Sequence, residues 1–240
     1  MASITEKTFG SRIANAEAFA SHLTSFTAYI PARTEDSALN YKALVTAIKA
    51  NNKVVASKKT TYSQAVDKRV KLFSKNTDSM AKTLTLIAGA IKAKFGKSSK
   101  ESKLISSLII QIRGESSKKL KKDNLGEFVS QSVRSYGSQT QTFSDIVSTL
   151  TSLGADYAPA NVKIKLVALN TQLTDLISAN DNVATTYGQY KPAIDTRVIQ
   201  YQDLKDRSDR IKESIKSQYT PSSSEYKLIK PNQLLFTYFH

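Results

Sequence analysis

The chain has 240 residues, a formal net charge of +15, no cysteine, and only 8 glycines and 5 prolines. A chain of this length can bury a sizeable core, and the missing cysteines exclude disulfides, thiolate nucleophiles and zinc–sulfur sites. The scarcity of glycine and proline favours helices over sheets.

Two helices are predicted in the first sixty residues. The first runs from about residue 12 to residue 28, with Ser11 as its N-cap and Pro31 enforcing its end. The second begins after Asp36 or Ser37 and carries an apolar stripe at helical spacing.

A long third helix is predicted from an apolar stripe that steps by three or four residues. Its members are Val66, Val70, Phe73, Met80, Leu84, Ile87, Ile91 and Phe95, with Thr77 filling the one gap in the series. We expect a break near residues 58–61 between the second and third helices, although no residue there forbids one continuous helix.

A fourth helix is predicted over residues 100–113, after a Ser-x-x-Glu pattern at Ser98 and Glu101. In such a capping box the serine hydroxyl and the glutamate carboxylate satisfy opposite backbone donors at the start of the helix. The same pattern returns at Ser222 and Glu225, where it predicts a last short helix.

Much of the first half of the chain occurs again in the second half, where residues 136–229 match residues 9–105. The matching pairs include Phe9 with Tyr136, Tyr29 with Tyr157, Asn51 with Asn180, Asp67 with Asp195, Arg69 with Arg197, and Phe95 with Tyr219. The offset is 127 to 129 for most of the way and 124 at the end. This pattern indicates that one unit was copied and then shortened by four residues, about one helical turn.

The second copy is predicted to repeat the helices of the first. A helix over about residues 139–153 is followed by one that begins near Asn161 and one over about residues 191–219. Pro192 fits the first turn of that last helix, which implies a break after Gly188. The apolar stripe of this helix consists of Ile194, Val198, Tyr201, Leu204, Ile211, Ile215 and Tyr219.

These elements predict an all-α fold, an elongated helical bundle built from two tandem copies of a roughly three-helix unit with a pseudo-two-fold relation. The expected divisions are helical repeat 1 (1–113), a basic linker (114–125) and helical repeat 2 (126–240). We expect the two repeats to pack as one bundle, because helices with a single apolar stripe need partners to bury it.

Three short motifs carry a resemblance to a known group of proteins. They are Ala-Asn at 50–51 and 179–180, Ala-x-Asp-x-Arg at 65–69 and 193–197, and Lys-x-x-Phe-Gly-x-x-Ser-x-Glu at 92–101. The chain resembles uncharacterised bacterial proteins made of tandem helical repeats, each ending in a Phe/Tyr-Gly-x-x-Ser-x-Glu-like signature. The second copy departs from that signature at Thr220-Pro221. The resemblance implies a helical fold and transfers no catalytic residue.

Groups able to perform chemistry are few. Gly96-Lys97-Ser98 is no phosphate loop, because residue 91, where such a loop needs a glycine, is isoleucine; Gly96 is interpreted as a helix C-cap. The two histidines, His22 and His240, have no repeated partner, so neither metal ligation nor activation of a nucleophile is supported.

A cluster of carboxylates in the last long helix is interpreted as helix-surface ion pairs rather than as a metal site. The expected pairs are Asp203 with Arg207, Asp206 with Arg210, Asp209 with Lys212, and Glu213 with Lys216.

Repeated polar residues in the helices are interpreted as contacts that fix helix packing. They are Asp67 with Arg69, Asp195 with Arg197, and the asparagines Asn51 and Asn180. We expect the acid–arginine pairs to tie the third helix to a neighbour through a partly buried ion pair or a cap, with a matched pair of ligand sites as the alternative. The asparagines are expected to form hydrogen bonds between helices.

Positive charge is concentrated between residues 92 and 122. The candidate residues for binding polyanions are Lys92, Lys94, Lys97, Lys100, Lys103, Lys118, Lys119, Lys121 and Lys122. Such a stretch attracts nucleic acid or another anionic surface without reading sequence, and its other interpretation is a solvated linker and helix face.

The end of the chain is more apolar and aromatic than a free terminus should be. The candidate assembly residues are Leu234, Leu235, Phe236, Tyr238 and Phe239. They are expected to dock either on the core of the same chain or on a neighbouring subunit, which would make a homo-oligomer.

The chain is expected to be a soluble cytoplasmic protein, with leaderless export left open. No apolar signal segment is visible at the N-terminus, and the longest apolar runs, Thr83–Ile91 and Leu104–Ile112, are about half as long as the ~20 residues of a membrane span.

The sequence favours a non-enzymatic structural or interaction protein whose helical bundle serves assembly or partner docking. The alternatives are sequence-independent binding of nucleic acid or another polyanion through residues 92–122, and a membrane-active helical protein. No cofactor, metal or small-molecule substrate is predicted, because no nucleophile, base and orienting group occur together.

Overall fold

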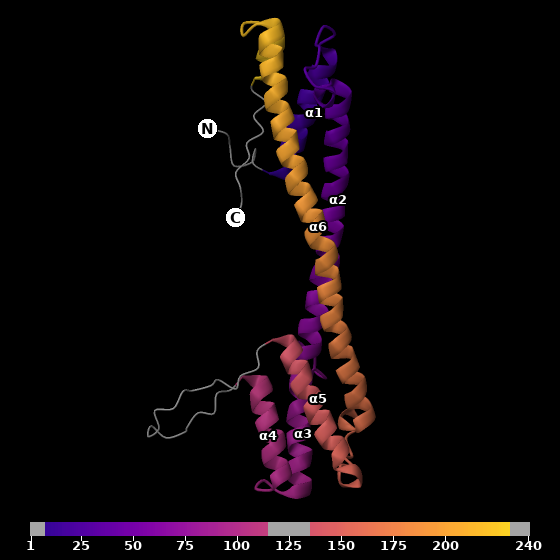
Figure 1. Ribbon diagram of the computed structural model, residues 1–240. Helices are drawn as coiled ribbons and strands as arrows, with labels where there is room; N and C mark the ends of the chain where they lie inside the picture. The colour runs from indigo at the N-terminus through magenta and orange to yellow at the C-terminus, as the bar shows by residue number, and fades with distance from the viewer. Residues whose placement is uncertain (1–7, 115–134, 231–240) are drawn as a thin grey trace, which may run out of the picture. The chain divides into compact units, whose positions relative to one another are not determined.

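The computed structural model describes residues 8–114 and 135–230, and every regular element within these ranges is helical. In chain order the α-helices are α1 (Phe9–Ser25), α2 (Ala38–Val70), α3 (Met80–Phe95), α4 (Lys100–Arg113), α5 (Tyr136–Ser152), α6 (Leu166–Tyr219) and α7 (Ser224–Ile229) (Figure 1). The shorter elements are 3-10 turns at Thr34–Asp36, Gly154–Asp156 and Val162–Ile164, and a π-helical turn at Lys71–Lys75. The predicted all-α class is confirmed.

The chain forms two compact units. Unit 1 combines residues 1–60 with residues 188–240, and unit 2 consists of residues 61–187. Each unit therefore takes helices from both halves of the chain. These units are a different division from the predicted repeats 1–113 and 126–240, which stay a prediction.

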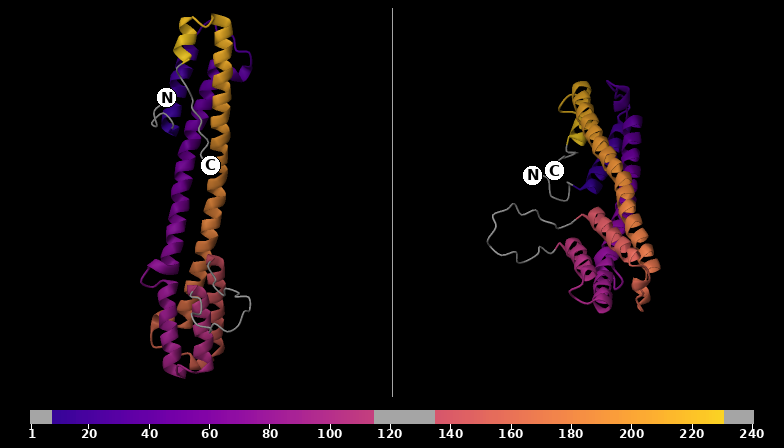
Figure 2. Two further views of the ribbon diagram at one scale, coloured as in Figure 1. Left: turned by 90° about the vertical axis from the view of Figure 1, so that its left-hand side faces the viewer. Right: turned by 60° about the horizontal axis from the view of Figure 1, so that its bottom comes forward.

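In unit 1, helix α1 packs with the first part of α2, the second part of α6, and α7, which turns back against α1 (Figure 2). The core of this unit includes the almost completely buried Phe19, Leu23, Ile48, Leu204 and Ile215. Burying such a side chain stabilises the fold by roughly 1.5–3 kcal/mol.

In unit 2, helix α4 packs against both α3 and α5, and the three helices are seen together in Figure 1. The core of this unit includes Leu84, Ile87, Ile105, Phe143 and Leu150, none of them more than 1% exposed. The predicted stripes are buried or half-buried in both units, with one exception. Val198 is 56% exposed, so the prediction that it belongs to the buried stripe is wrong.

Two helices begin earlier than the sequence predicts. Helix α1 starts at Phe9 because Thr8, not Ser11, is its N-cap: the Thr8 side chain accepts a hydrogen bond from the Ser11 N–H at 3.1 Å. Helix α5 starts in the same way, with Ser135 accepting from the Ser138 N–H at 3.0 Å. A serine or threonine three residues further upstream thus provides the cap.

The expected break near residues 58–61 is absent, and α2 runs through this region without interruption. The expected break after Gly188 is also wrong, because α6 is continuous over 54 residues and contains Pro192 in its interior. A proline there removes the hydrogen bond to the carbonyl four residues earlier, which belongs to Gly188.

The predicted third helix is divided where Thr77 interrupts its stripe. The chain leaves α2 through the π-helical turn and begins α3 only at Met80, with the Ser79 hydroxyl donating to the Ser74 carbonyl at 3.1 Å. The four-residue shortening of the second copy falls between the positions that match Phe73 and Lys92. Helix α6 passes the corresponding place without a loop.

The predicted helix over residues 100–113 is confirmed at both ends, but its capping box is wrong. Ser99, rather than Ser98, is the N-cap and accepts from the Ser102 N–H at 3.1 Å. Ser223 caps α7 in the same way. Glu101 and Glu225 therefore lie two residues after the N-cap, one position short of the third residue that a capping box requires.

The residues before these two caps have an unusual backbone. Gly96 has a φ of 83°, and its counterpart in the repeat, Thr220, has a φ of 75° and is the one described non-glycine residue with positive φ. A β-branched residue with positive φ is strained, at a cost of about 1–2 kcal/mol.

We expect Thr220→Gly to raise the free energy of unfolding by about 1 kcal/mol, since the relieved strain exceeds the added entropy of an unfolded glycine. The reciprocal Gly96→Thr, whose Cβ would meet nothing within 4 Å, should lower it by a similar amount. Urea unfolding followed by circular dichroism measures both. If Thr220 is strained, the two substitutions must change the free energy of unfolding in opposite directions. A Thr220→Gly variant that is less stable than the natural chain would contradict the strain.

Candidate functional site

Two arginines that match each other in the repeat make the same contact. Arg69 lies over the ring of Tyr136, and Arg197 lies over the ring of Phe9, each at 4.1 Å from its guanidinium carbon to the ring centre. These contacts join α2 to α5 in unit 2 and α6 to α1 in unit 1. A guanidinium over an aromatic face contributes about 0.5–2 kcal/mol.

The expected partly buried acid–arginine ion pairs are therefore wrong. Asp67 pairs with Lys71 at 2.6 Å, and Asp195 pairs with Lys191 one helical turn earlier, all four side chains being about half exposed. The arginines do tie their helices to a neighbour, but an aromatic ring takes the place of the carboxylate, and the ligand-site alternative gains no support.

The predicted asparagine contacts are confirmed as bonds between helices. The Asn51 amide donates to the Gln200 side chain at 3.0 Å and to the Ala193 carbonyl at 3.3 Å, joining α2 to α6. The Asn180 amide donates to the Thr140 hydroxyl at 3.0 Å, joining α6 to α5.

Each unit contains a groove of about 660 Å³. In unit 1 it lies between α6 and the segment that follows α1, and in unit 2 between α3 and the segment that follows α5. The unit 1 groove is lined by Tyr29, Ala32, Arg33, Asp36, Asp209, Arg210, Glu213, Ser214, Ser217 and Gln218. The unit 2 groove is lined by Thr85, Leu86, Gly89, Ala90, Ala93, Lys94, Asp156, Tyr157, Ala158, Pro159, Ala160, Asn161 and Ile164. Every residue of the first set has its repeat counterpart in the second, at an offset of 128 or 124.

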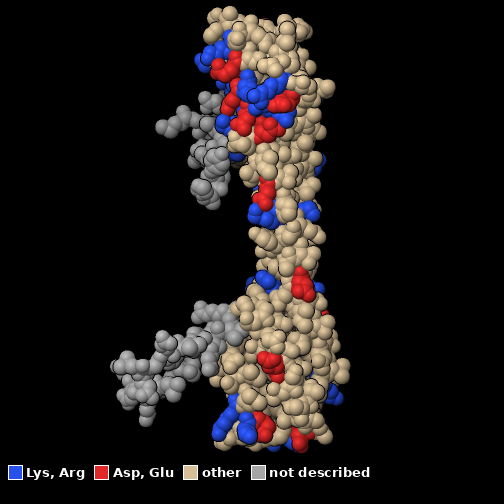
Figure 3. All heavy atoms as spheres, in the orientation of Figure 1, with Lys and Arg blue, Asp and Glu red and all other residues tan. Residues whose placement is uncertain are grey.

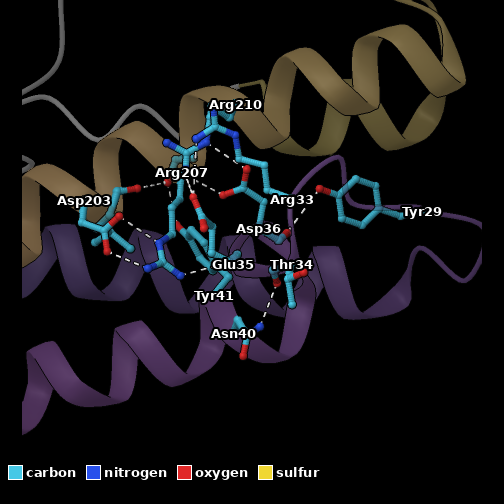
Figure 4. Close-up of polar contacts among 12 residues, drawn as sticks. Tyr29, Arg33, Thr34, Glu35, Asp36, Asn40, Tyr41, Asp203, Arg207 and Arg210 are labelled. Carbon is cyan, nitrogen blue, oxygen red and sulfur yellow. Dashed lines mark hydrogen bonds and ion pairs between the residues drawn. The ribbon is translucent and has the colours of Figure 1, made fainter.

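The unit 1 groove is crossed by polar contacts between α6 and the segment that precedes α2. Arg210 binds Asp36 through both oxygens, with Nε to Oδ2 at 2.9 Å and Nη2 to Oδ1 at 2.7 Å (Figure 4). The Gln218 amide donates to the Ile30 carbonyl at 2.6 Å, and its oxygen accepts from the Ile30 N–H at 3.0 Å. The two walls of this groove are therefore tied together by its own side chains.

Two of the four ion pairs expected on α6 are wrong, the first of them because of the Arg210 contact. Arg207 pairs with Asp203 at 2.8 Å, and Lys216 pairs with Glu213 at 3.3 Å, as predicted. Arg210 does not pair with Asp206, because it reaches the more deeply buried Asp36, whose side chain is 4% exposed. A charge-assisted bidentate bond in a buried place is stronger than an exposed pair on one helix.

The second correction concerns Lys212, which does not pair with Asp209. Asp209 pairs instead with Lys205 at 2.7 Å. The Lys212 ammonium lies 6.0 Å from the centre of the Phe19 ring, and burial lowers its pKa. Figure 3 shows the acidic and basic side chains of this part of unit 1 gathered on one face.

The unit 2 groove has the same position but a different lining. Leu86 stands where unit 1 has Arg210, and Gly89 stands where unit 1 has Glu213. Two serines are likewise replaced by Ala90 and Ala93. The unit 2 groove is therefore lined by two charged residues where the unit 1 groove has five, and its one ion pair, Lys94 with Asp156 at 3.6 Å, is exposed.

Several of the predicted polyanion-binding lysines come together on unit 2. A hollow of about 460 Å³ at the junction of α3 and α4 is lined by Lys92, Lys97, Lys103, Ser102, Ser106, Ser107 and Ile110. Figure 3 shows basic side chains, with acidic ones beside them, at the lower end of this unit. We call this feature the lysine hollow.

The other predicted lysines are distributed differently. Lys94 pairs with Asp156 in the unit 2 groove, and Lys100 is exposed in the first turn of α4. Lys118, Lys119, Lys121 and Lys122 lie outside the described residues, as do the tail residues Leu234, Leu235, Phe236, Tyr238 and Phe239.

No group of three or more His, Cys, Asp or Glu side chains in residues 8–114 and 135–230 is arranged to hold a metal ion. His22 is half-buried in the last turn of α1, as predicted for a helix histidine. None of the described helices combines the length and the apolarity needed to cross a bilayer.

Comparison with protein-family models, with curated proteins and with solved structures finds no significant match. The resemblance to bacterial tandem-repeat proteins stays a prediction.

Sequence reasoning did not identify the two grooves. A signal was present, because residues 85–94 and 209–218 match in the repeat while Gly89, Ala90 and Ala93 replace a glutamate and two serines. This loss of polar side chains at one side of a helix could have marked the unit 2 groove.

Proposed function

We propose that this protein is a non-enzymatic interaction protein that assembles through the unit 2 groove. The observation that carries the proposal is the contrast between two grooves at matching positions: a bidentate ion pair joins the walls of the unit 1 groove, whereas the unit 2 groove lacks that bridge and has few charged side chains. A contiguous exposed apolar surface is typical of an interaction site.

We infer that both grooves descend from one duplicated helical unit. The matched Arg69 and Arg197 contacts support this, as do the hydrogen bonds of Tyr29 to the Asp36 carbonyl and of Tyr157 to the Ile164 carbonyl. After duplication, a groove that keeps its polar bridges would serve stability, and one that loses them would be free for a partner.

The proposed occupant is segment 231–240 of a second copy. This segment contains no Lys, Arg, Asp or Glu, and half of its residues are leucine, phenylalanine or tyrosine. The α3 wall of the groove, from Thr85 to Lys94, is about 14 Å long at ~1.5 Å per helical residue, which equals about four residues of extended chain. Residues 234–239 are enough to cover that wall.

We expect Gly89→Glu to shift the full chain toward a lower mass in solution, by about tenfold in the dissociation constant. The substitution restores in unit 2 the carboxylate that Glu213 supplies in unit 1. The matched control is Gly188→Glu, since both glycines are exposed in a helix with no atom within 4 Å of an added Cβ. Sedimentation equilibrium measures the change.

Disulfide capture tests the occupant itself, because the natural chain has no cysteine. A chain carrying Ala93→Cys, mixed with a chain carrying Thr237→Cys, should form a crosslinked heterodimer, whereas Gly188→Cys should not. If crosslinking needs both cysteines on one chain, the segment docks in its own chain. That result, or a monomer at every concentration, contradicts assembly by this route.

We propose polyanion binding as a second function, because three of the predicted lysines line one hollow rather than a dispersed surface. This function requires retention on DNA or heparin that weakens steeply as salt rises. Retention that is independent of salt would contradict it.

A further inference from the structure

We propose that the lysine hollow seats a single backbone phosphate of a nucleic-acid strand. This inference rests on the second proposed function, polyanion binding. It adds that the polyanion binds at one defined site, and not only by diffuse attraction to positive charge. Lys92 comes from the last turn of α3, Lys97 from the connection, and Lys103 from the first turn of α4, so the three cations approach one hollow from different elements.

The cations of the hollow are not ion-paired in the part of the chain that the structure describes, although Glu101 lies two residues before Lys103 in the first turn of α4. Lys92, Lys97 and Lys103 form no ion pair with any carboxylate of the described residues, in contrast to Lys94, which is paired with Asp156. An anion that enters the hollow therefore has no protein carboxylate to displace. Lysines in a concave place concentrate positive potential more strongly than the same charges on a flat face.

The hollow also contains hydroxyl groups that can donate hydrogen bonds to a phosphate. Ser106 and Ser107 line it, and their hydroxyls can donate to phosphate oxygens. The Ser102 hydroxyl is already used, since it donates to the Gly96 carbonyl at 2.7 Å. The hollow runs along the 14-residue α4 from Ser102, in its first turn, to Ile110. The dipole of α4 adds to the attraction for an anion only where the hollow passes that first turn.

A polymer with repeating charges fits better than a membrane surface. Lys100 extends the positive charge beyond the hollow along α4, which suits successive phosphates of one strand. A membrane-binding surface needs apolar side chains beside its cations, and the hollow contains only Ile110, which is 39% exposed.

The corresponding place in unit 1 supplies matched controls. Lys97 is replaced by Pro221, and the counterpart of Lys92, Lys216, pairs with Glu213 at 3.3 Å. Lys227, the counterpart of Lys103, is exposed.

The test measures binding of the full chain to a fluorescent DNA duplex of about 20 base pairs by anisotropy, over a range of salt. The pair Lys97→Gln and Lys103→Gln should raise the dissociation constant at least about tenfold and reduce the salt slope by about 2. The control pair is Lys53→Gln, at an exposed position of α2, with Lys227→Gln. It removes the same charge and should change the constant less than about twofold.

A neutral variant separates a seated phosphate from diffuse attraction. Ser106→Ala with Ser107→Ala changes no charge and should weaken binding about threefold or more, whereas attraction by charge alone predicts no change. If the hollow pair and the control pair weaken DNA binding equally, polyanion binding stands and the seated phosphate is wrong. If no variant binds DNA or heparin, the second function itself fails. Binding to phosphatidylserine vesicles without binding to DNA overturns the nucleic-acid assignment.

Discussion

Replacing Arg210 with methionine is expected to lower the free energy of unfolding by about 3 kcal/mol. The Asp36 side chain is 4% exposed and receives two hydrogen bonds from the Arg210 guanidinium. The substitution keeps most of the aliphatic volume but leaves a buried carboxylate without its cation. The greater part of the loss comes from that unpaired charge rather than from the lost attraction.

The matched control is Arg33→Met in the same groove. Arg33 is 60% exposed and lies 3.6 Å from Glu35, so its loss should cost about 0.5 kcal/mol or less. Urea unfolding followed by circular dichroism measures both variants. Adding Asp36→Leu to Arg210→Met should restore part of the stability, because no charge is then buried alone. Equal effects of the two arginine variants would contradict the role assigned to Arg210.

The features that the sequence predicted correctly are set by neighbours along the chain. The helix over residues 100–113 lies between a serine cap and Gly114, and the second helix begins directly after Ser37, as its apolar period indicates. The bonds made by Asn51 and Asn180 were predictable because both interrupt otherwise apolar faces.

The errors arose where a distant partner outweighs a local one. Arg210 has a carboxylate four residues earlier at Asp206, yet it binds Asp36, which is 174 residues away. The spacing of charged residues along a helix identifies partners on the same helix but not partners from another part of the chain. The pairing of Arg210 with Asp36 therefore could not be predicted from the sequence of α6 alone.

Helix continuity was misjudged for a related reason. Pro192 is unfavourable inside an isolated helix, but the flanking parts of α6 are held by their own cores, which include Leu176 and Leu204. Tertiary packing on both sides of the proline outweighs the lost hydrogen bond. The break instead falls at Thr77, where no core residue occupies the stripe.

Alkaline pH is expected to destabilise unit 2 through Tyr157. Burial raises the pKa of this phenol from 10.0 to about 12, and its hydroxyl donates to the Ile164 carbonyl at 2.7 Å. Because the folded pKa lies above the unfolded one, the stabilising contribution is complete below about pH 10 and is lost as the pH rises toward 12. At about pH 11.5 the loss should reach about 2 kcal/mol.

The measurement compares the free energy of unfolding at about pH 8 and about pH 11.5 for the natural chain and for Tyr157→Phe. The variant loses a hydrogen bond at both pH values, yet its decrease between them should be smaller by about 2 kcal/mol, since phenylalanine cannot ionise. Tyr41 and Tyr201, whose pKa values burial also raises, remain in both chains and leave a shared decrease in unit 1. Tyr187→Phe, at a half-exposed position, is the matched control. If Tyr157→Phe and Tyr187→Phe show the same pH dependence, the buried Tyr157 phenol does not link unit 2 stability to pH.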